Sequence, residues 1–349
     1  MVTTTRNELI NFFKGRKKPK NITLNLFGEY FCMDSNFEIK IFSGSSSIAF
    51  SDGVCRSLGV EEGKIEIKKF ANGETYVRLL ENVREKDVFL IQTAVEPIND
   101  NLFELLIMID AARRASAGRI TVIMPNFFYA RQDRKAASRE AITAKLVANL
   151  LESSGANRII TLELHSDQAQ GFFDIPFDNL TPKRIFIKKV KELGLDMDNC
   201  VVVAPDAGAA KKSTKISKTL DCGLAIINKV RTKHNEAEGW NIIGDDVKGK
   251  NCFVFDDMCD TGGSLVLAAK MLKENGAEKI YAFITHGIFS GNAIEKICSS
   301  EMEKLYTTNT LPQKGCANIE VIDVSDYFAE TIKAIHENKS VSELFDKGL

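Results

Sequence analysis

Short apolar runs alternate with longer segments of helical period along most of this chain. The apolar runs predict six strands, at 88–91, 120–124, 159–164, 201–204, 252–255 and 280–284. Between them, apolar residues recur every three or four positions and predict helices at 100–117, 142–153, 208–220 and 264–275. Strands that alternate with helices are typical of parallel sheets with helices on both faces. The pattern therefore predicts the α/β fold class.

One sequence module occurs twice and predicts two related domains. Residues 151–165 and 272–286 share the pattern L-x-x-x-G-A-x-x-I and end in His165 and His286. The Gly-Ala pair suits the end of a helix, where glycine takes the left-handed conformation. An ordinary helix–strand turn is the alternative explanation. Prolines near 180–185 indicate a linker, so we predict an N-terminal extension and two domains, at 1–37, 38–182 and 183–349.

Charge and hydropathy exclude several function classes. Of the 349 residues, 46 are basic and 47 acidic, so the net charge is −1. This balance argues against a protein that binds nucleic acid through overall positive charge. No apolar run reaches the roughly 18 residues of a membrane helix, so we expect no membrane partner. The N-terminus lacks a signal-peptide core, and its basic residues indicate a solvated tail or, alternatively, a targeting arm.

The cysteines are too sparse for a disulfide scaffold, and no two have the C-x-x-C spacing of a zinc knuckle. We therefore predict that all eight are reduced thiols and that the protein is cytoplasmic. They are Cys32, Cys55, Cys200, Cys222, Cys252, Cys259, Cys298 and Cys316.

The segment CFVFDDMCDTGGS at 252–264 carries the most specific chemical signal. A buried strand of apolar residues ends at two carboxylates, and a glycine-containing loop leads into a helix. Glycines allow close backbone approach, and a helix N-terminus favours an anion. The paired carboxylates can accept hydrogen bonds from vicinal sugar hydroxyls. An ordinary strand–turn–helix with a capping serine is the alternative. We predict a pentose-phosphate site made of Asp256, Asp257, Asp260, Thr261, Gly262, Gly263 and Ser264.

Residues 253–264 resemble the ribose-phosphate-binding motif of type I phosphoribosyltransferases and of ribose-phosphate diphosphokinase (phosphoribosyl pyrophosphate synthetase). Further segments resemble the diphosphokinase, in its order: KIFSGSSS at 40–47, FFYARQDR at 127–134, TLELHSDQAQGFFDIP at 161–176, VAPDAG at 203–208 and SVSELF at 340–345. The resemblance implies two type I phosphoribosyltransferase-like domains, each a mainly parallel sheet flanked by helices.

The resemblance also implies a reaction. The family transfers the β,γ-diphosphoryl group of ATP to the C1 hydroxyl of ribose 5-phosphate, which gives 5-phosphoribosyl 1-pyrophosphate and AMP. Such a site must hold two anions together and neutralise charge on the transferring phosphates. The alternatives are a phosphoribosyltransferase that consumes this product, and a non-catalytic regulatory subunit of the synthetase.

Individual residues take their expected roles from the same resemblance. Phe70, Asn72 and Glu74 correspond to the family's adenine-binding loop, which reaches a neighbouring subunit's site. Arg131 and Gln132 correspond to further partners of ATP. The family therefore implies a homo-oligomer, and a hexamer is the expected form.

The implied cofactor is Mg²⁺. His165 and Asp206 correspond to the family's magnesium ligands, although Mg²⁺ prefers oxygen and a histidine is the less expected member. The segment at 205–213 resembles the family's diphosphate-binding segment. Most relatives carry a second glycine where this chain has Ala209.

Two weaker assignments complete the set. The charged segment at 228–240 predicts a mobile lid, in which Lys229 and Arg231 correspond to the family's catalytic lysine and arginine. A solvated charge run is the alternative there. Four residues resemble positions where relatives bind activating phosphate or inhibitory ADP between subunits: Ser47, Asn82, Arg84 and Arg139.

Overall fold

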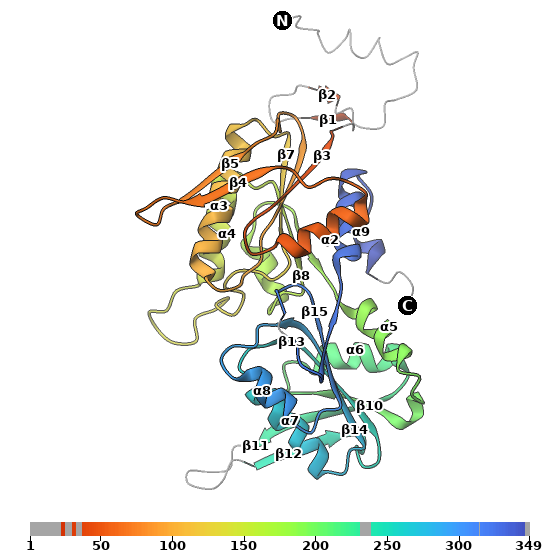
Figure 1. The fold of residues 1–349 in the computed structure, drawn as a ribbon. Coiled ribbons are helices and arrows are strands. Elements are labelled where there is room, and N and C mark those ends of the chain that lie inside the picture. The colour runs from red at the N-terminus through yellow and green to blue at the C-terminus, as the bar shows by residue number, and fades with distance from the viewer. Residues whose placement is uncertain (1–21, 25–29, 33–36, 231–238, 314, 346–349) are drawn as a thin grey trace, which may run out of the picture. The chain divides into compact units, whose positions relative to one another are not determined.

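The computed structural model describes residues 22–24, 30–32, 37–230, 239–313 and 315–345. Residues 1–38 and 39–349 form two compact units. In the smaller unit, β1 (Ile22–Leu24) and β2 (Tyr30–Cys32) pair antiparallel with each other. The larger unit contains the predicted α/β fold (Figure 1).

The first sheet of the larger unit has five parallel strands in the order β3-β6-β7-β8-β9. They are β3 (Ile39–Ser43), β6 (Asp87–Ile91), β7 (Arg119–Met124), β8 (Arg158–Leu162) and β9 (Phe177–Leu180). The helical elements between these strands are α2 (Ile48–Leu58), α3 (Ile98–Arg114), α4 (Thr143–Ser154) and the 3-10 helix η1 (Asp167–Phe172). A separate antiparallel hairpin joins β4 (Ile65–Lys69) to β5 (Thr75–Leu79).

The second sheet has seven strands in the order β12-β11-β10-β13-β14-β15-β16. All neighbours are parallel except β11 and β12. The strands are β10 (Cys200–Ala204), β11 (Gly223–Val230), β12 (Gly239–Gly244), β13 (Asn251–Cys259), β14 (Lys279–Gly287), β15 (Lys304–Thr308) and β16 (Ile319–Ile322). The helical elements of this part are α5 (Lys183–Glu192), η2 (Met197–Asn199), α6 (Ala210–Leu220), α7 (Gly263–Glu274) and α8 (Ala293–Cys298).

The central strands of each sheet are buried on both faces, which explains why they are continuous apolar runs. Successive residues of a strand point to opposite faces. In β6, Leu90 packs in a core with α3 and α4, whereas Phe89 packs in a second core with α2. The second sheet likewise has one core with α7 and α8 and another with α5 and α6. The predicted fold class is therefore confirmed.

The predicted ends of two neighbouring strands are too early, and for the run at 280–284 the strand β14 continues to Gly287. The apolar run at 252–255 was expected to end before Asp256, but β13 continues to Cys259. Its neighbour β14 is equally long, and the two strands stay paired from Asp256 opposite Ile284 to Cys259 opposite Gly287. Both aspartates therefore project from a paired strand rather than from a loop.

The helix near the C-terminus packs against the first sheet. In Figure 1, α9 (Ser325–His336) lies beside α2, although the two are far apart in sequence. Phe328 is fully buried, and its ring meets that of Phe50 edge-on at 5.1 Å. The short 3-10 helix η3 (Ser342–Leu344) follows. The chain thus returns from the second sheet to complete the core of the first, while the predicted domain boundary at 182–183 stays a prediction.

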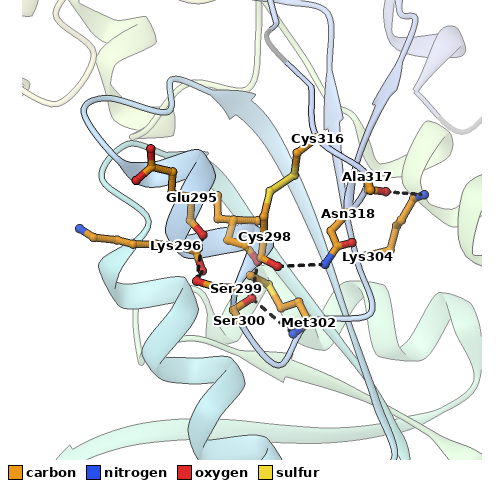
Figure 2. The surroundings of a disulfide bond; sticks show 11 residues. Glu295, Lys296, Cys298, Ser299, Ser300, Met302, Lys304, Cys316, Ala317 and Asn318 are labelled. Carbon is orange, nitrogen blue, oxygen red and sulfur yellow. Dashed lines mark hydrogen bonds between the residues drawn. A yellow bond between two sulfur atoms is a disulfide. The ribbon is translucent and has the colours of Figure 1, made fainter.

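The prediction that every cysteine is a reduced thiol is wrong for two of them. Cys298, the last residue of α8, forms a disulfide with Cys316 in the segment between β15 and β16 (Figure 2). The two cysteines are 18 positions apart in sequence, so no spacing motif predicts the bond. Cys55, Cys200, Cys222, Cys252 and Cys259 are free. Within the described residues, no helix is long and apolar enough to cross a membrane.

The position of Phe328 generates a stability prediction. Replacing Phe328 with Ala should lower the free energy of unfolding by about 3–5 kcal/mol, because the change removes a fully buried ring. Chemical unfolding followed by tryptophan fluorescence and circular dichroism measures the loss. Leu267→Ala, on the exposed side of α7, is the control and should change stability by less than about 1 kcal/mol. Equal effects of the two changes would contradict the placement of α9.

Candidate active site

The predicted phosphate loop lies between β13 and α7. Asp260, Thr261 and Gly262 connect the strand to the helix, which begins at Gly263. Gly262 has φ +74°, a left-handed conformation that side chains disfavour. The loop therefore turns sharply, and the unpaired N–H groups of the first turn of α7 lie where an anion can be bound. This local geometry agrees with the predicted cradle.

The two adjacent aspartates of β13 have different environments. Burial, the charge of Asp257 and a hydrogen bond with it raise the pKa of Asp256 well above its usual range. Burial also opposes ionisation of Asp257, but hydrogen bonds with His165 and Asp256 outweigh it and lower the pKa of Asp257. Asp257 therefore carries the negative charge of the pair, and Asp256 is the more readily protonated member.

His165 comes from the other half of the chain and meets this pair. Its Nδ1 lies 2.7 Å from Oδ2 of Asp257. The hydrogen bond with Asp257 raises the pKa of His165, although partial burial opposes the shift. The side chain of His165 is 41% exposed, so the face that does not meet Asp257 is open to a ligand. The contact joins the segment after β8 to the end of β13.

Glu163 joins the segment after β8 to α6 and β14, and no feature of the sequence pattern predicted this role. Its Oε1 lies 2.5 Å from Nζ of Lys212 on α6. Its other carboxylate oxygen accepts a hydrogen bond from the hydroxyl of Thr285 on β14. Its carbonyl oxygen lies 3.1 Å from Nε2 of His286. Glu163 has a positive φ of 49°, so backbone and side chain are both fixed by the second half. His165, two residues later, is thereby held against Asp257.

His286 is fully buried. Its two ring nitrogens lie near the Thr310 hydroxyl and the Glu163 carbonyl, and burial lowers its pKa. These contacts fit a structural role for His286, in contrast to the exposed ring of His165.

A second contact between the halves joins Arg131 to the phosphate loop. The guanidinium of Arg131 lies 2.8 Å from Oδ2 of Asp260. Burial opposes ionisation of Asp260, but hydrogen bonds with Ser290 and Arg131 outweigh it and lower the pKa of Asp260. A cavity of about 800 Å³ lies here and is lined by Arg131, Gln132, Asp260, Ser290 and Gln313 among others. Its size suits a nucleotide-sized ligand.

Asp206 lies in the exposed turn between β10 and α6. One of its carboxylate oxygens, Oδ1, accepts a hydrogen bond of 2.9 Å from the N–H of Ala209. Ala209 has φ −78°, an ordinary helical value, so the methyl group that replaces the family's glycine is accommodated. The Lys212–Glu163 ion pair ties the helix that follows Asp206 to the segment that carries His165.

The residues present fit a magnesium ion that is held mainly by substrate. Within the described parts of the chain, no three candidate ligands gather into a metal cluster. Mg²⁺ usually keeps several waters and binds through one or two carboxylates plus substrate phosphates. An exposed Asp206 and an open ring face on His165 agree with that mode.

Three predicted ATP residues lie elsewhere, at the tip of the β4–β5 hairpin. Phe70 and Glu74 are joined by a backbone hydrogen bond of 2.8 Å, and the side chain of Asn72 accepts one from the N–H of Glu74. Phe70 is 50% exposed, and Phe103 on α3 is 61% exposed. Both line a second cavity of about 350 Å³, together with Lys69 and Asp100. The hairpin tip therefore presents aromatic and polar groups to the outside.

The remaining predicted residues divide into three groups. The backbone of Lys229 pairs with Trp240 across β11 and β12, whereas Arg231 lies outside the described residues. Ser47, which was assigned to the regulatory set by resemblance, is buried at the start of α2. The other three residues of the predicted regulatory set, Asn82, Arg84 and Arg139, are exposed.

The His165–Asp257 contact predicts the titration of one imidazole. In the metal-free protein, His165 should titrate above 6.5, and Asp257→Asn should lower its pKa because the charged acceptor is lost while partial burial remains. The raised pKa stabilises the fold below pH 6.5, and this contribution is lost as pH rises through the folded value. NMR titration of the ring protons measures both. Asp110→Asn, on the exposed face of α3, is the control; equal shifts from the two variants would refute the pairing.

Comparisons with known proteins agree with this geometry. Residues 39–155 match the family model described as the N-terminal domain of ribose phosphate pyrophosphokinase. Residues 229–346 match the phosphoribosyl synthetase-associated domain. The two matched ranges contain the phosphate loop and the Arg131 segment, and the His165 segment lies between them.

Similar proteins cover almost the whole chain. Ribose-phosphate pyrophosphokinase 2 of Schizosaccharomyces pombe is 48% identical over 318 residues, which are 90% of this chain and 98% of that protein. Ribose-phosphate pyrophosphokinase of Chromobacterium violaceum is 45% identical over 316 residues, 89% of this chain and 96% of that one. The crystal structure of phosphoribosylpyrophosphate synthetase from Mycobacterium smegmatis matches with a TM-score of 0.82 and 39% identity, over 86% of this chain and 99% of that chain. The chain belongs to the ribose-phosphate pyrophosphokinase family.

Proposed function

We propose that this chain transfers the β,γ-diphosphoryl group of ATP to the C1 hydroxyl of ribose 5-phosphate and releases AMP. The observation that carries this proposal is the 2.7 Å contact between His165 and Asp257. It places the histidine of one half beside the pentose-phosphate loop of the other. Relatives with this family name match the chain over nine-tenths of its length.

In this proposal, the residues of β13 and the following loop hold ribose 5-phosphate. Asp256 and Asp257 accept hydrogen bonds from the ribose hydroxyls, and the backbone of Thr261 to Ser264 binds the 5-phosphate. The lowered pKa of Asp257 favours its ionised form, which is the better acceptor. A sugar held by two carboxylates and a phosphate cradle is fixed in orientation, and such fixing contributes a large part of the rate.

Arg131 and Gln132 bind ATP in the 800 Å³ cavity. Arg131 changes partner from Asp260 to a phosphate or the base when substrate binds, because its side chain is more than half exposed and can reorient. Lys229 and Arg231 stabilise charge on the transferring phosphates, as the family resemblance implies. His165 and Asp206 would hold Mg²⁺, which would supply positive charge to neutralise the phosphates.

The proposed assembly is a homo-oligomer in which Phe70, Asn72 and Glu74 complete the site of a neighbouring subunit. The exposed Phe70 and Phe103 support it, because neighbouring exposed aromatic side chains mark interaction surfaces. A hexamer is the proposed form, and the proposed location is the cytoplasm. We also propose that Arg84, Arg139, Asn82 and Ser47 respond to phosphate or ADP at subunit contacts, which rate measurements across phosphate concentrations test.

The proposed reaction has a direct test. In the presence of Mg²⁺, AMP release from ATP should require ribose 5-phosphate. A phosphoribosyltransferase would instead require a nucleobase, and a regulatory subunit would release no AMP. Lys229→Ala combined with Arg231→Ala should lower kcat by about 10³-fold or more while ribose 5-phosphate still binds, because these groups act on the transferring phosphates. Lys218→Ala, on the exposed end of α6, is the control. Near-normal turnover of the double variant would remove both residues from the mechanism.

The role of the hairpin tip has a separate test by complementation. Phe70→Ala with Glu74→Ala should be inactive, and so should Lys229→Ala with Arg231→Ala. Co-expressed, the two inactive subunits should regain activity, because random assembly gives a site with both parts intact in about one case in four. Size-exclusion chromatography with light scattering reports the oligomer itself. If co-expression restores nothing while mixed oligomers form, the hairpin tip serves its own subunit.

A further inference from the structure

The disulfide between Cys298 and Cys316 is the feature of this molecule that the proposed reaction does not use. Figure 2 shows the bond between the end of α8 and the segment that joins β15 to β16. The two Cα atoms are 6.8 Å apart, and both residues are half-buried. A disulfide that is partly accessible can be attacked by a thiolate from solution.

The free cysteines in the described part of the chain are chemically different from this pair. Burial raises the pKa of Cys55, Cys200 and Cys222 to about 11. Burial raises the pKa of Cys252 and Cys259 to about 12. Because the thiolate is the reactive form, these thiols are inert at neutral pH. Among the cysteines whose side chains the structure describes, Cys298 and Cys316 are therefore the pair suited to thiol–disulfide exchange.

The bond joins two parts of the wall of the 800 Å³ cavity. Ile294 lines the cavity from α8, four residues before Cys298. Pro312 and Gln313 line it from the other segment, shortly before Cys316. The same cavity is lined by Arg131 and Gln132, so the disulfide lies behind a cavity that is also lined by residues proposed to bind ATP.

The segment is anchored unevenly along its length. Near its start, Thr310 is buried, and its carbonyl accepts a 2.6 Å hydrogen bond from the hydroxyl of Thr93. Beyond the cavity, the side chain of Asn318 donates to the Cys298 carbonyl at 3.5 Å, and that of Lys304 donates to the Ala317 carbonyl at 3.3 Å. The Asn318 carbonyl accepts a 2.8 Å hydrogen bond from the N–H of Leu305. The disulfide adds a covalent attachment to this second part, and its cleavage leaves the buried Thr310 anchor and the hydrogen bond from Gln313 to the Gly287 carbonyl in place.

We propose that Cys298 and Cys316 form a reversible redox modification site that controls the wall of the nucleotide cavity. A thiolate of glutathione or of a protein dithiol attacks one sulfur, which forms a mixed disulfide and releases the other cysteine as a thiol. A second thiol of the reductant then attacks the reductant's sulfur in the mixed disulfide, which releases the remaining cysteine as a thiol. The chain gains two thiols, and the reductant becomes a disulfide, so two electrons and two protons are transferred. The oxidised state holds the wall closed and binds nucleotide more tightly. The change in nucleotide affinity rests on the proposed function, whereas the reversible formation of the disulfide does not.

The test compares oxidised and reduced forms of the full chain. The protein is equilibrated in graded mixtures of reduced and oxidised glutathione, alkylated and analysed by mass spectrometry. This gives the fraction of molecules in which the Cys298–Cys316 bond is formed. Hydrogen exchange of residues 309–318 and equilibrium binding of ATP are measured on the two end states. Reduction should speed exchange in this segment and raise the Kd for ATP several-fold. Cys298→Ser should match the reduced state and abolish its response to glutathione, while the control Cys222→Ser should retain it.

Each outcome decides the proposal. If Cys298 and Cys316 are both alkylated after equilibration with oxidised glutathione, no such site exists. If the bond forms but exchange and ATP binding are equal in both states, the bond is not a control site. Loss of AMP release in every state would overturn the proposed reaction but not the redox site, because exchange and binding are measured without turnover. Cys316→Ser provides a second reduced-state variant if Cys298→Ser does not fold.

Discussion

Two adjacent carboxylates, Asp256 and Asp257, lie largely buried on β13, and their mutual repulsion is the constraint on which the site depends. Two neighbouring acids in a low-dielectric position cannot both ionise without a nearby cation. The pKa of Asp256 is raised and that of Asp257 is lowered, so the repulsion is relieved because Asp256 is protonated more readily than Asp257. The compensating groups are His165 and Lys212, and His165 comes from the other half of the chain. The charge of Asp257 is therefore stabilised in part across the contact between the two halves.

Glu163 shows how this meeting is made specific. It contacts Lys212 and Thr285 through its side chain and His286 through its carbonyl oxygen. A single residue at the end of β8 thus contacts both α6 and β14. The helix α6 follows Asp206, and β14 pairs with the strand that carries Asp256 and Asp257. Ligands bind at the carboxyl ends of parallel strands, and the contacts of Glu163 set those ends of two sheets against each other. Its positive φ is a local strain that these contacts offset.

Features that depend on neighbouring residues in the sequence could be predicted, whereas features that depend on contacts between distant residues could not. The strand–helix alternation and the glycine at 262 follow from neighbouring residues, and both were predicted from the sequence. The extension of β13 depends on the length of β14, and the placement of α9 depends on a core that begins almost 300 positions earlier. The Glu163 contacts span more than 120 positions with Thr285 and His286. The disulfide was missed because its two cysteines meet only after β15 is in place.

The charge at the site also explains why a divalent cation and further basic groups are needed. In the described residues, Lys212 and Arg131 are already paired with acids, to Glu163 and Asp260. His165 adds a charge only while it is protonated, and it is paired with Asp257. Substrates that carry several phosphates add more negative charge to a site whose cations are engaged, and such charge is costly in a partly buried position. Binding must therefore bring positive charge with it, and Mg²⁺, Lys229 and Arg231 are the proposed sources. The same reasoning explains how a chain with a net charge of −1 can serve polyanions, because its cations are drawn to one place rather than present in excess.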